Sequence, residues 1–324
     1  MSTPMSTPDI HSASPAPAPA LRRLSDVTWA WMQDSDAWGY SNAGLIASQG
    51  QALLVDTQFT LGATRQLLTA VEDVCPLDAV GTVVSTHQNG DHTWGNQLLP
   101  QAEIITSAAG AAGGCHEMGP DQLTQLCRSP AEGKAQAYVV EHFGHFDFSD
   151  VTVIPPTRTF EGHEEIKIGG VVVELIDLGA GHSAGDVAVH VPDHRVVFAG
   201  DALFSGGHTI VWSGSVSGCI RACQTLLDTG AETFVPGHGT LLDRAGVAAV
   251  RDRLQAVADA ATSYAQRGMP LADAARLIKT DHAGTWAHPE RLFTQTAAAY
   301  TEAGIDGVPS GTWAVVEGMA ALTP

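Results

Sequence analysis

The segment STHQNGDHTWGN, residues 85–96, concentrates ligand-type side chains in a short stretch. His87, Asn89, Asp91 and His92 follow directly after the apolar run AVGTVV. A loop that only turns the chain needs Gly and Asn, but it does not need two imidazoles and a carboxylate. Imidazole and carboxylate together suit a divalent ion such as zinc, with iron or manganese as alternatives. The segment therefore predicts a metal site holding one or two Zn²⁺ ions.

Three later segments carry the same kind of residue in the same context. They contain His182 in GAGHSAGD, Asp201 in VVFAGDALF and His238 in FVPGHGT. Each of these residues follows an apolar run with strand character and adjoins glycine, so all of them are expected at a sheet edge, where loops form sites. One Gly-His pair alone would favour a surface or capping histidine, because the chain has 14 histidines. Four such segments favour a shared metal centre.

The ordered set of motifs resembles the metallo-β-lactamase superfamily. That family has His-x-His-x-Asp-His after a buried strand, then Gly-His, Gly-Asp and a final Gly-His, and the resemblance covers residues 29–242. It implies an α+β fold, a four-layer αββα sandwich with the site in a groove at one edge of the two sheets. The implied metal ligands are His87 and His182 at a first site, Asp91, His92 and His238 at a second site, and Asp201 as the bridge.

Asn89 departs from this pattern, because it stands where the family has a second histidine. An amide oxygen binds zinc more weakly than an imidazole does, so the first site is expected to be empty, weak or unusually ligated. The second site keeps its complete ligand set and should hold one ion tightly. In the alternative interpretation, the Asn89 amide NH2 group points at substrate or at a bound hydroxide.

The implied reaction is hydrolysis by a metal-bound hydroxide of an ester, lactone, thioester or similar electrophilic carbon in a small molecule. Asp91 would orient the water or pass a proton to the leaving group. Asp56, at the end of LLVDT, is a candidate to hold an imidazole. In the segment after Asp201, His208 and Trp212 are either a proton donor and an aromatic wall of the pocket, or a loop residue and a core residue.

Two alternative functions use the same metal centre. One is a hydrolytic dehalogenase that acts on an activated aromatic ring. The other is non-hydrolytic, either an iron-dependent sulfur oxygenase or a metal binder without turnover. Hydrolysis of β-lactams is disfavoured because the N-terminus lacks a secretory signal.

Composition limits the partners and the compartment. With 35 acidic and 16 basic residues, the formal charge of −19 disfavours nucleic acid and anionic membranes as partners and leaves a small-molecule substrate. Five cysteines without a Cys-x-x-Cys pair favour a reducing, cytoplasmic location. A homo-oligomer is possible.

Residues 1–24 are rich in Ser, Pro and Ala and are expected to form a disordered leader. Residues 25–324 are expected to form a single metallo-β-lactamase-like domain, mainly helical from about residue 244. The segment HFGHFDF, residues 142–148, is either a loop over the groove or, as favoured here, a plain surface loop. The histidines predicted to be structural or solvated are His116, His142, His145, His163, His190, His194, His282 and His288.

Overall fold

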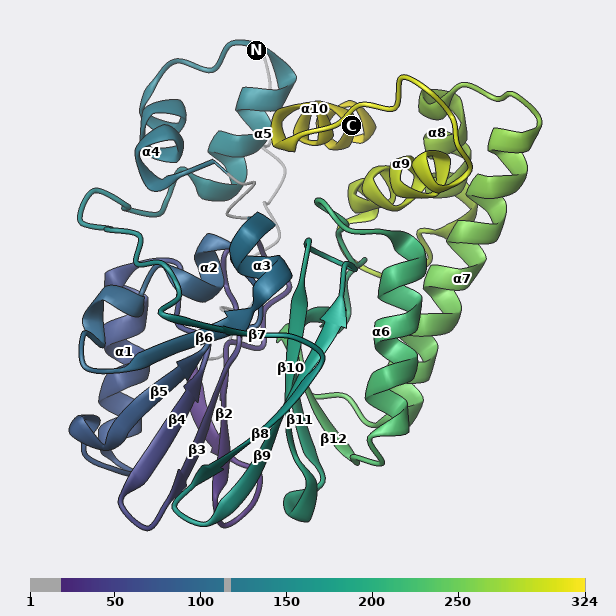
Figure 1. Cartoon of the computed structure of the whole chain (residues 1–324). Helices are drawn as coiled ribbons and strands as arrows, with labels where there is room; N and C mark the ends of the chain where they lie inside the picture. The colour runs from purple at the N-terminus through teal and green to yellow at the C-terminus, as the bar shows by residue number, and fades with distance from the viewer. Residues whose placement is uncertain (1–18, 114–117, 324) are drawn as a thin grey trace, which may run out of the picture.

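The computed structural model describes residues 19–113 and 118–323, which form two mixed β-sheets and the helices around them (Figure 1). The first sheet has seven strands in chain order. Strands β1 to β4 pair antiparallel, and β4 to β7 pair parallel. The strands are β1 (Ala20–Arg23), β2 (Thr28–Met32), β3 (Ala43–Ser48), β4 (Gln51–Val55), β5 (Val80–Val84), β6 (Glu103–Ser107) and β7 (Arg158–Phe160).

The second sheet has five strands in the order β12-β11-β10-β9-β8. Its strands pair antiparallel except for β11 and β12, which are parallel, so the two strands that contain Asp201 and His238 run in the same direction. The strands are β8 (His163–Ile168), β9 (Val171–Gly179), β10 (Asp186–Val191), β11 (Val196–Phe204) and β12 (Thr233–His238).

Helices cover the outer faces of the sheets and lie above one edge of the sandwich. In Figure 1, α1 lies outside the first sheet and α6 and α7 lie outside the second, which confirms the predicted αββα layering. The α-helices are α1 (Leu61–Glu72), α2 (Gly90–Thr93), α3 (Ala108–Gly113), α4 (Pro120–Arg128), α5 (Gly133–Phe143), α6 (Val216–Asp228), α7 (Arg244–Gln266), α8 (Leu271–His282), α9 (Leu292–Glu302) and α10 (Thr312–Leu322). The 3₁₀ turns are η1 (Leu77–Ala79), η2 (Asn96–Leu98), η3 (Pro192–His194) and η4 (Pro289–Arg291).

The strand sequences alternate so that each sheet buries both of its faces. On β3, Ile46 points between the sheets, where it shares a cluster with Phe198 of β11. The next residue back, Leu45, points to the opposite face and packs with Leu67 of α1. Successive side chains of a strand point to opposite faces, so these two positions fix which face of β3 meets the second sheet.

Local turn and capping residues set the boundaries of the elements that lead to the site. Gln49 and Gly50 have φ angles of 47° and 77° and form the turn of the hairpin that joins β3 to β4. The Thr60 side chain accepts a hydrogen bond from the Ala63 amide at 3.1 Å and caps α1. Because β4 and β5 pair in parallel, their C-terminal ends lie at the same edge of the sheet, where the metal-ligand motif begins.

The N-terminal boundary differs from the prediction. Residues 1–18 of the predicted leader lie outside the described residues. Ala20–Arg23 form the edge strand β1, which pairs with β2 through the register Leu21 to Trp31, so the leader prediction is wrong for these residues. The apolar side chain of Leu21 packs beside the outer cluster of the first sheet, which explains why this segment is ordered.

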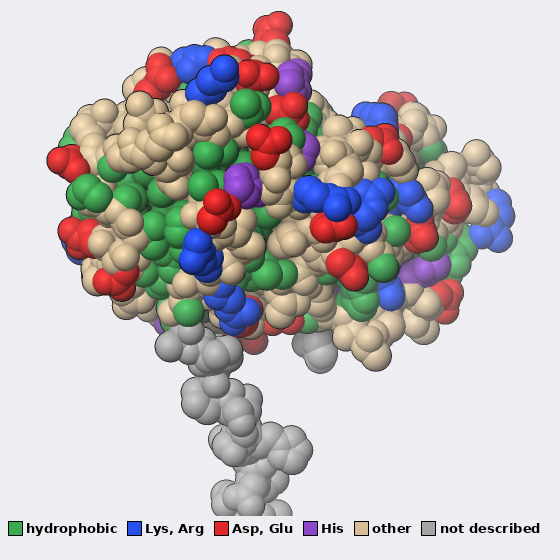
Figure 2. All heavy atoms as spheres, turned by 90° about the horizontal axis from the view of Figure 1, so that it is seen from below, with side chains coloured by type: hydrophobic (Ala, Val, Ile, Leu, Met, Phe, Trp, Pro, Cys, Tyr) green, Lys and Arg blue, Asp and Glu red, His purple; other side chains and the backbone are tan. Residues whose placement is uncertain are grey.

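No helix in the described part of the chain is long and apolar enough to cross a bilayer. On the face seen from below in Figure 2, acidic and basic side chains are interspersed among hydrophobic and other residues.

Candidate metal centre

The opening motif begins where β5 ends and runs into the short helix α2. His87 follows β5, Asn89 is the residue before α2, and Asp91 and His92 lie within that helix. The side chains of His87 and His92 are 1% and 0% exposed, and their ring centres are 4.4 Å apart. The compact turn therefore aims two neighbouring imidazoles at one point.

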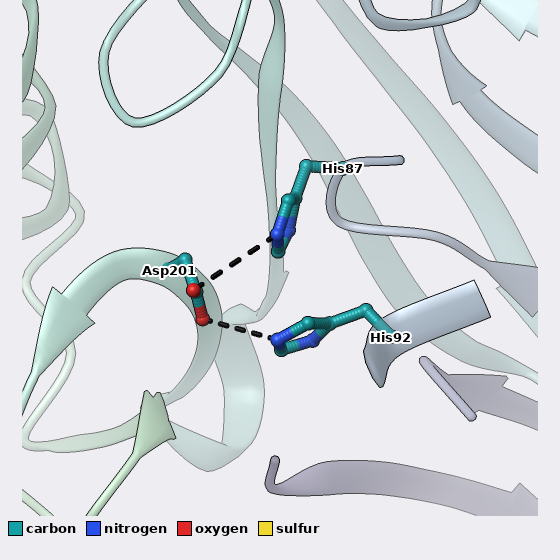
Figure 3. Close-up of side chains that lie close together, drawn as sticks. All are labelled: His87, His92 and Asp201. Atoms are coloured by element: carbon teal, nitrogen blue, oxygen red, sulfur yellow. Dashed lines mark ion pairs between the residues drawn. The ribbon is translucent and has the colours of Figure 1, made fainter. Parts of the chain in front are cut away.

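Asp201 lies at the centre of the histidine cluster. Its Oδ1 atom is 3.1 Å from His92 Nε2 and 3.4 Å from His238 Nε2. Its Oδ2 atom is 3.5 Å from His182 Nε2 and 4.0 Å from His87 Nε2. Figure 3 shows the carboxylate between two of these rings. One carboxylate that reaches all four imidazoles fits the bridging position that the resemblance implied.

Two glycines allow Asp201 to reach this position. A Cβ atom added at Gly237 would lie 1.8 Å from Asp201 Oδ1. Gly200, with a φ angle of 51°, lies so close to Thr86 that a Cβ atom there would be 2.4 Å from its hydroxyl oxygen. Crowding by the Asp201 carboxylate at Gly237 and by the Thr86 side chain at Gly200 therefore requires glycine at both positions.

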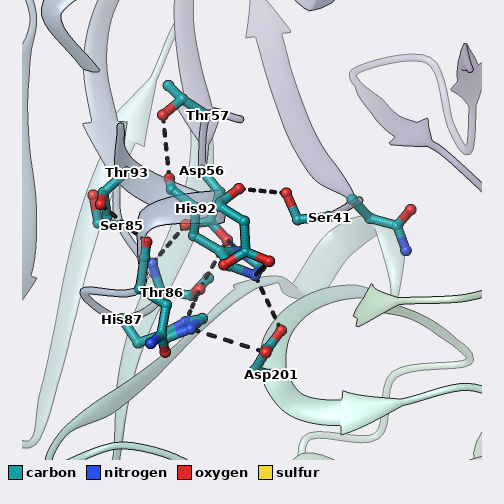
Figure 4. Close-up of polar contacts among 12 residues, drawn as sticks. Ser41, Asp56, Thr57, Ser85, Thr86, His87, His92, Thr93 and Asp201 are labelled. Carbon is teal, nitrogen blue, oxygen red and sulfur yellow. Dashed lines mark hydrogen bonds and ion pairs between the residues drawn. The ribbon is translucent and has the colours of Figure 1, made fainter. Parts of the chain in front are cut away.

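A buried hydrogen-bond relay fixes the orientation of His87 and His92 (Figure 4). Asp56 Oδ2 accepts a hydrogen bond from His92 Nδ1 at 2.9 Å and from the Thr86 hydroxyl at 2.8 Å. Because that hydroxyl donates to Asp56, it accepts from His87 Nδ1, which is 3.0 Å away. Asp56, at the end of β4, has a φ angle of 63°, an uncommon conformation for a residue other than glycine. The role predicted for Asp56 in holding an imidazole matches this geometry.

Backbone carbonyls orient the other two histidines. His182 Nδ1 donates to the Ile210 carbonyl at 2.9 Å, and His238 Nδ1 donates to the Tyr40 carbonyl at 3.0 Å. All four imidazoles therefore carry their proton on Nδ1 when neutral and direct the Nε2 lone pair toward Asp201. The sequence analysis did not identify these carbonyls, because every residue carries the same backbone group.

The atoms that face the centre lack hydrogen-bond partners among the described residues. They are His87 Nε2, His92 Nε2 and Asp201 Oδ1, and all are fully buried. Buried polar atoms without partners are costly unless another group satisfies them. Their donor atoms are nitrogen and carboxylate oxygen, which divalent ions of the zinc type prefer. The residues present therefore fit a bound metal.

Two overlapping groups of ligand atoms could each hold an ion. In each group the atoms lie within 4.8 Å of one another; one group is His87, His92 and Asp201, and the other is Asp91, His92 and His238. The second group matches the predicted second site. The first group differs from the predicted first site, because it joins His87 to His92, whereas the resemblance paired His87 with His182. The Nε2 atom of His182 lies 3.5 Å from Asp201 Oδ2, at the edge of this group.

Electrostatics in the cluster reflect burial and the crowding of charges. Burial and the neighbouring His92 hold the pKa of His87 well below its ordinary value. Burial also disfavours a charged His92, but the carboxylates of Asp201 and Asp91 outweigh it and raise its pKa well above 6.5. For His238, burial is likewise outweighed, chiefly by Asp201, and the pKa rises to about 9. In the absence of metal, protons on His92 and His238 balance the negative charge of Asp91 and Asp201, as a bound cation would otherwise do.

Asn89 lies against His182, at the place where the family pattern has a histidine. Its Oδ1 atom is 2.9 Å from His182 Nε2, and its side chain is 7% exposed. Because His182 Nδ1 donates to Ile210, a neutral ring offers a lone pair at Nε2. If the Asn89 amide oxygen faces His182, the oxygen and the Nε2 lone pair would bind the same metal ion. If the amide nitrogen faces His182 instead, it donates a hydrogen bond to Nε2, and Nε2 is then not free to bind a metal.

A cavity of about 690 Å³, counted with its open mouth, leads to the metal centre. We call its polar part the floor; the floor residues are Asn89, Asp91, Asp201 and His238. We call the side chains from α4, α5, α10 and the turn before α4 the roof. The roof residues are Met118, Leu123, Tyr138, Val139, Phe143, Thr312, Val316 and Met319. Aromatic walls join the two, formed by Trp38, Phe59, Phe204 and Trp212.

The cavity confirms one of the two predictions made for the segment after Asp201. Trp212 lines the cavity, so it is a wall residue. His208 does not belong to the lining, and its prediction as a catalytic proton donor is wrong. Its ring packs near Trp286, and its Nε2 donates to the Ala283 carbonyl at 3.1 Å. Burial lowers the pKa of His208 to about 4, so it is a neutral structural side chain.

The prediction of a plain surface loop for residues 142–148 is also wrong. Phe143 lines the cavity, and Phe148 is 2% exposed beside Phe59 at 4.7 Å between ring centres. The ring centres of His142 and Trp38 are 5.9 Å apart. This segment therefore supports the aromatic wall, as in the alternative interpretation of a loop over the groove.

Comparison with known proteins identifies the class of protein that this fold and centre define. The model of the metallo-beta-lactamase superfamily matches residues 36–238. That range contains all seven residues of the centre, and the chain belongs to this superfamily.

Among curated relatives, the chain is similar to 2,4-dinitroanisole O-demethylase subunit alpha of Nocardioides sp. (strain JS1661), at 28% identity over 59% of the chain and 50% of the relative. It is 25% identical to acyl-coenzyme A thioesterase MBLAC2 of Gallus gallus, over 64% of the chain and 76% of the relative. Hydroxyacylglutathione hydrolase of Methylococcus capsulatus is 29% identical over 48% of the chain and 46% of the relative. The chain spans about half the length of the first and third of these relatives.

Solved structures show the same fold at low sequence identity. A metallo-beta-lactamase from Pontibacter korlensis aligns with a TM-score of 0.54 and 21% identity, over 73% of this chain and 99% of that one. A variant of the sec-alkyl sulfatase PisA1 aligns with a TM-score of 0.64 and 14% identity, over 88% of this chain and 50% of that one. The predicted fold class is thereby confirmed.

Proposed function

We propose that the protein hydrolyses an ester, lactone or thioester of a small molecule and uses zinc as its metal. The observation that carries this proposal is the convergence of unpartnered, buried ligand atoms beneath an apolar cavity. Similarity to a thioesterase and to a hydroxyacylglutathione hydrolase supports the choice of carbonyl substrates. The apolar roof and walls fit the body of a small organic substrate.

Asp91, His92 and His238, which form one of the two ligand groups, would hold one ion tightly together with Asp201, whose Oδ1 lies 3.1 Å from His92 Nε2 and 3.4 Å from His238 Nε2. His87, His182 and Asn89 would form a weaker first site. When bound, a divalent ion supplies a water of lowered pKa and polarises the carbonyl. The chain supplies the rest of the chemistry through its own side chains.

Asp91 is placed to handle a proton beside the reacting group. It lines the cavity, its side chain is 14% exposed, and its Oδ2 lies 3.3 Å from His238 Nε2. Interactions with His92 and His238 outweigh the effect of burial and lower the pKa of Asp91, so it is a carboxylate at neutral pH and accepts a hydrogen bond from water. The apolar walls exclude bulk water from the same space.

Elemental analysis together with a substrate panel tests this proposal. Purified protein, prepared without chelators, is expected to contain zinc and to hydrolyse one or more members of an ester, lactone and thioester panel. His92→Ala should lower the metal content and reduce activity at least about a thousandfold. His163→Ala is the control, because that side chain is 54% exposed and lies on β8 outside the centre. Metal-free protein that cannot be loaded, or an active His92→Ala variant, would refute the proposal.

A second candidate reaction is hydrolysis at an activated aromatic ring. It is favoured by the similarity to a dinitroanisole O-demethylase and by the aromatic walls of the cavity. Trp38 and Trp212, whose ring centres are 6.1 Å apart, offer apolar faces to a flat ring. Activated aryl halides and aryl methyl ethers, assayed for released halide and methanol, distinguish this reaction from ester hydrolysis, which releases an acid.

A further inference from the structure

Arg291 is a buried cation in the wall of the cavity. It ends the 3₁₀ turn η4, in the helical region that follows β12, and its side chain is 2% exposed. The guanidinium carbon lies 4.2 Å from the centre of the Trp38 ring and 5.3 Å from that of Phe204. The same residue lines the cavity with Asp91 and Asp201 of the floor. Two aromatic rings therefore hold a positive charge beside the space that a substrate would enter.

The guanidinium has few protein partners for its five N–H groups. Among the described residues, its one hydrogen bond runs from Nη1 to the His208 carbonyl over 3.4 Å, and its buried Nε has no acceptor. The adjacent carboxylate of Glu290 accepts instead from the Tyr138 hydroxyl at 3.0 Å and lies 3.3 Å from His288 Nδ1. No ion pair joins Arg291 to a described carboxylate. A buried cation of this kind is stabilised by an external anion.

We propose that Arg291 binds a carboxylate group of the substrate, so that the enzyme acts on small monoanionic molecules with an apolar or aromatic body. This inference rests on the proposed function and names its substrate class. The planar fork of a guanidinium matches a carboxylate through two parallel hydrogen bonds. The substrate group inside the cavity carries a single charge, because Arg291 is the one Lys or Arg among the described lining residues.

The ring of Phe204 lies close to both the Arg291 guanidinium and the metal centre. Phe204 stacks on the ring of His238 with 5.1 Å between centres and an interplanar angle of 10°. The same ring lies 5.3 Å from the Arg291 guanidinium. A substrate with one ring between its carboxylate and its reacting bond is therefore long enough to contact both.

A matched pair of ligands tests this inference without turnover. Phenylacetate and phenylacetamide have nearly the same shape and differ in charge. Calorimetric titration would compare their binding to the zinc-loaded wild type and to the Arg291→Gln and Arg291→Lys variants. Arg253→Gln is the matched control, because Arg253 also stacks on a tryptophan, Trp286 at 4.3 Å, but does not line the cavity.

Arg291→Gln is expected to weaken phenylacetate binding about ten- to a hundredfold and phenylacetamide binding less than about threefold. Arg291→Lys keeps the charge without the fork, so it should weaken phenylacetate binding at least about threefold. Arg253→Gln should change neither ligand. An unchanged phenylacetate affinity in Arg291→Gln, or equal losses for the acid and the amide, would overturn the inference.

Two further measurements keep the result interpretable. Zinc content should be equal in the wild type and in Arg291→Gln, which shows that the lost affinity does not come from a lost ion. If Arg291→Gln does not fold, the Arg291→Lys variant decides, and an unchanged phenylacetate affinity there overturns the inference. A wild type that hydrolyses no ester but binds phenylacetate through Arg291 would contradict the proposed function and leave the anion site standing.

Discussion

The floor and the roof of the cavity are positioned by different forces. On the floor, His238 is fixed by a directional hydrogen bond to the Tyr40 carbonyl at 3.0 Å, and the neighbouring His92 is fixed by one to Asp56 at 2.9 Å. On the roof, Val316 and Met319 of α10 are fixed by apolar packing against neighbouring helices. Directional bonds fix atoms to within tenths of an ångström, whereas apolar packing tolerates changes of side-chain shape. The floor therefore determines the reaction, and the roof and walls determine which substrate fits.

The largest expected effect comes from removing the central carboxylate of the floor. Asp201→Ala leaves four buried imidazoles without the anion that reaches all of them. Zinc content should fall below one ion per chain, and hydrolysis should fall at least about a thousandfold. Elemental analysis and initial rates measure the two effects. Asp193→Ala, at an exposed site just before β11, is the control and should retain both. Full metal content in Asp201→Ala would contradict the central role of this carboxylate.

Asp56→Asn should have the next largest effect, because it acts on the floor through other residues. The amide cannot accept strong hydrogen bonds from both His92 and Thr86 as the carboxylate does. Loss of such an outer partner typically weakens metal binding about 10- to 100-fold. Competition with a zinc chelator measures the affinity. An Asp56→Asn variant with wild-type zinc affinity would show that the turn alone orients His92.

Asn89→His tests whether Asn89 weakens the first metal site, because it introduces the histidine expected from the family pattern. The imidazole would replace an amide beside His182, 2.9 Å from its Nε2. We expect a second zinc ion to bind about tenfold more tightly or better, because imidazole is the stronger ligand. Titration followed by elemental analysis should give a higher metal content than the wild type. Asn89→Asp is the companion variant, and equal stoichiometry in all three proteins would show that Asn89 does not limit the first site.

The sequence predicted the floor better than the roof because floor residues follow strands in short motifs. The apolar runs and glycines beside His87, Asp201 and His238 are readable in the sequence, and the structure brings all three residues together at β5, β11 and β12. The roof comes from helices whose apolar faces look like ordinary packing until the fold is known. Arg291 illustrates this limit, since nothing local to PERL distinguishes it from a solvated arginine.

The wrong prediction for His208 has a related physical cause. It follows Asp201 by a few residues, but β11 continues through Phe204, and His208 no longer belongs to the cavity lining. The backbone of His208 then pairs with Ala287, so its side chain faces the helical region. Closeness in sequence sets how far a residue can lie from the metal, but it does not set the direction in which its side chain points.

His208→Gln separates a structural role from a catalytic one by its pH dependence. The pKa of His208 is about 4 in the folded protein and 6.5 in its ordinary state. As the pH falls below 6.5, the unfolded chain binds a proton that the folded chain refuses, so the free energy of unfolding falls by up to about 1.4 kcal/mol per pH unit until about pH 4. Denaturant titrations between pH 4 and 8 should show a shallower pH slope for His208→Gln than for the wild type. A hundredfold loss of kcat at pH 7 in a folded variant would instead restore the catalytic role.

Trp212→Leu should have the smallest effect, because it changes a wall and leaves the floor intact. Trp212 faces Trp38, and its amide donates a backbone hydrogen bond to the His182 carbonyl, which leucine preserves. An aromatic ester loses one ring contact, and its KM should rise about three- to tenfold with kcat nearly unchanged. An aliphatic ester of similar length should be affected less, because leucine offers it comparable apolar surface. A fall in kcat with an unchanged KM would place Trp212 in the reaction itself and would remove the distinction between floor and wall on which these expectations depend.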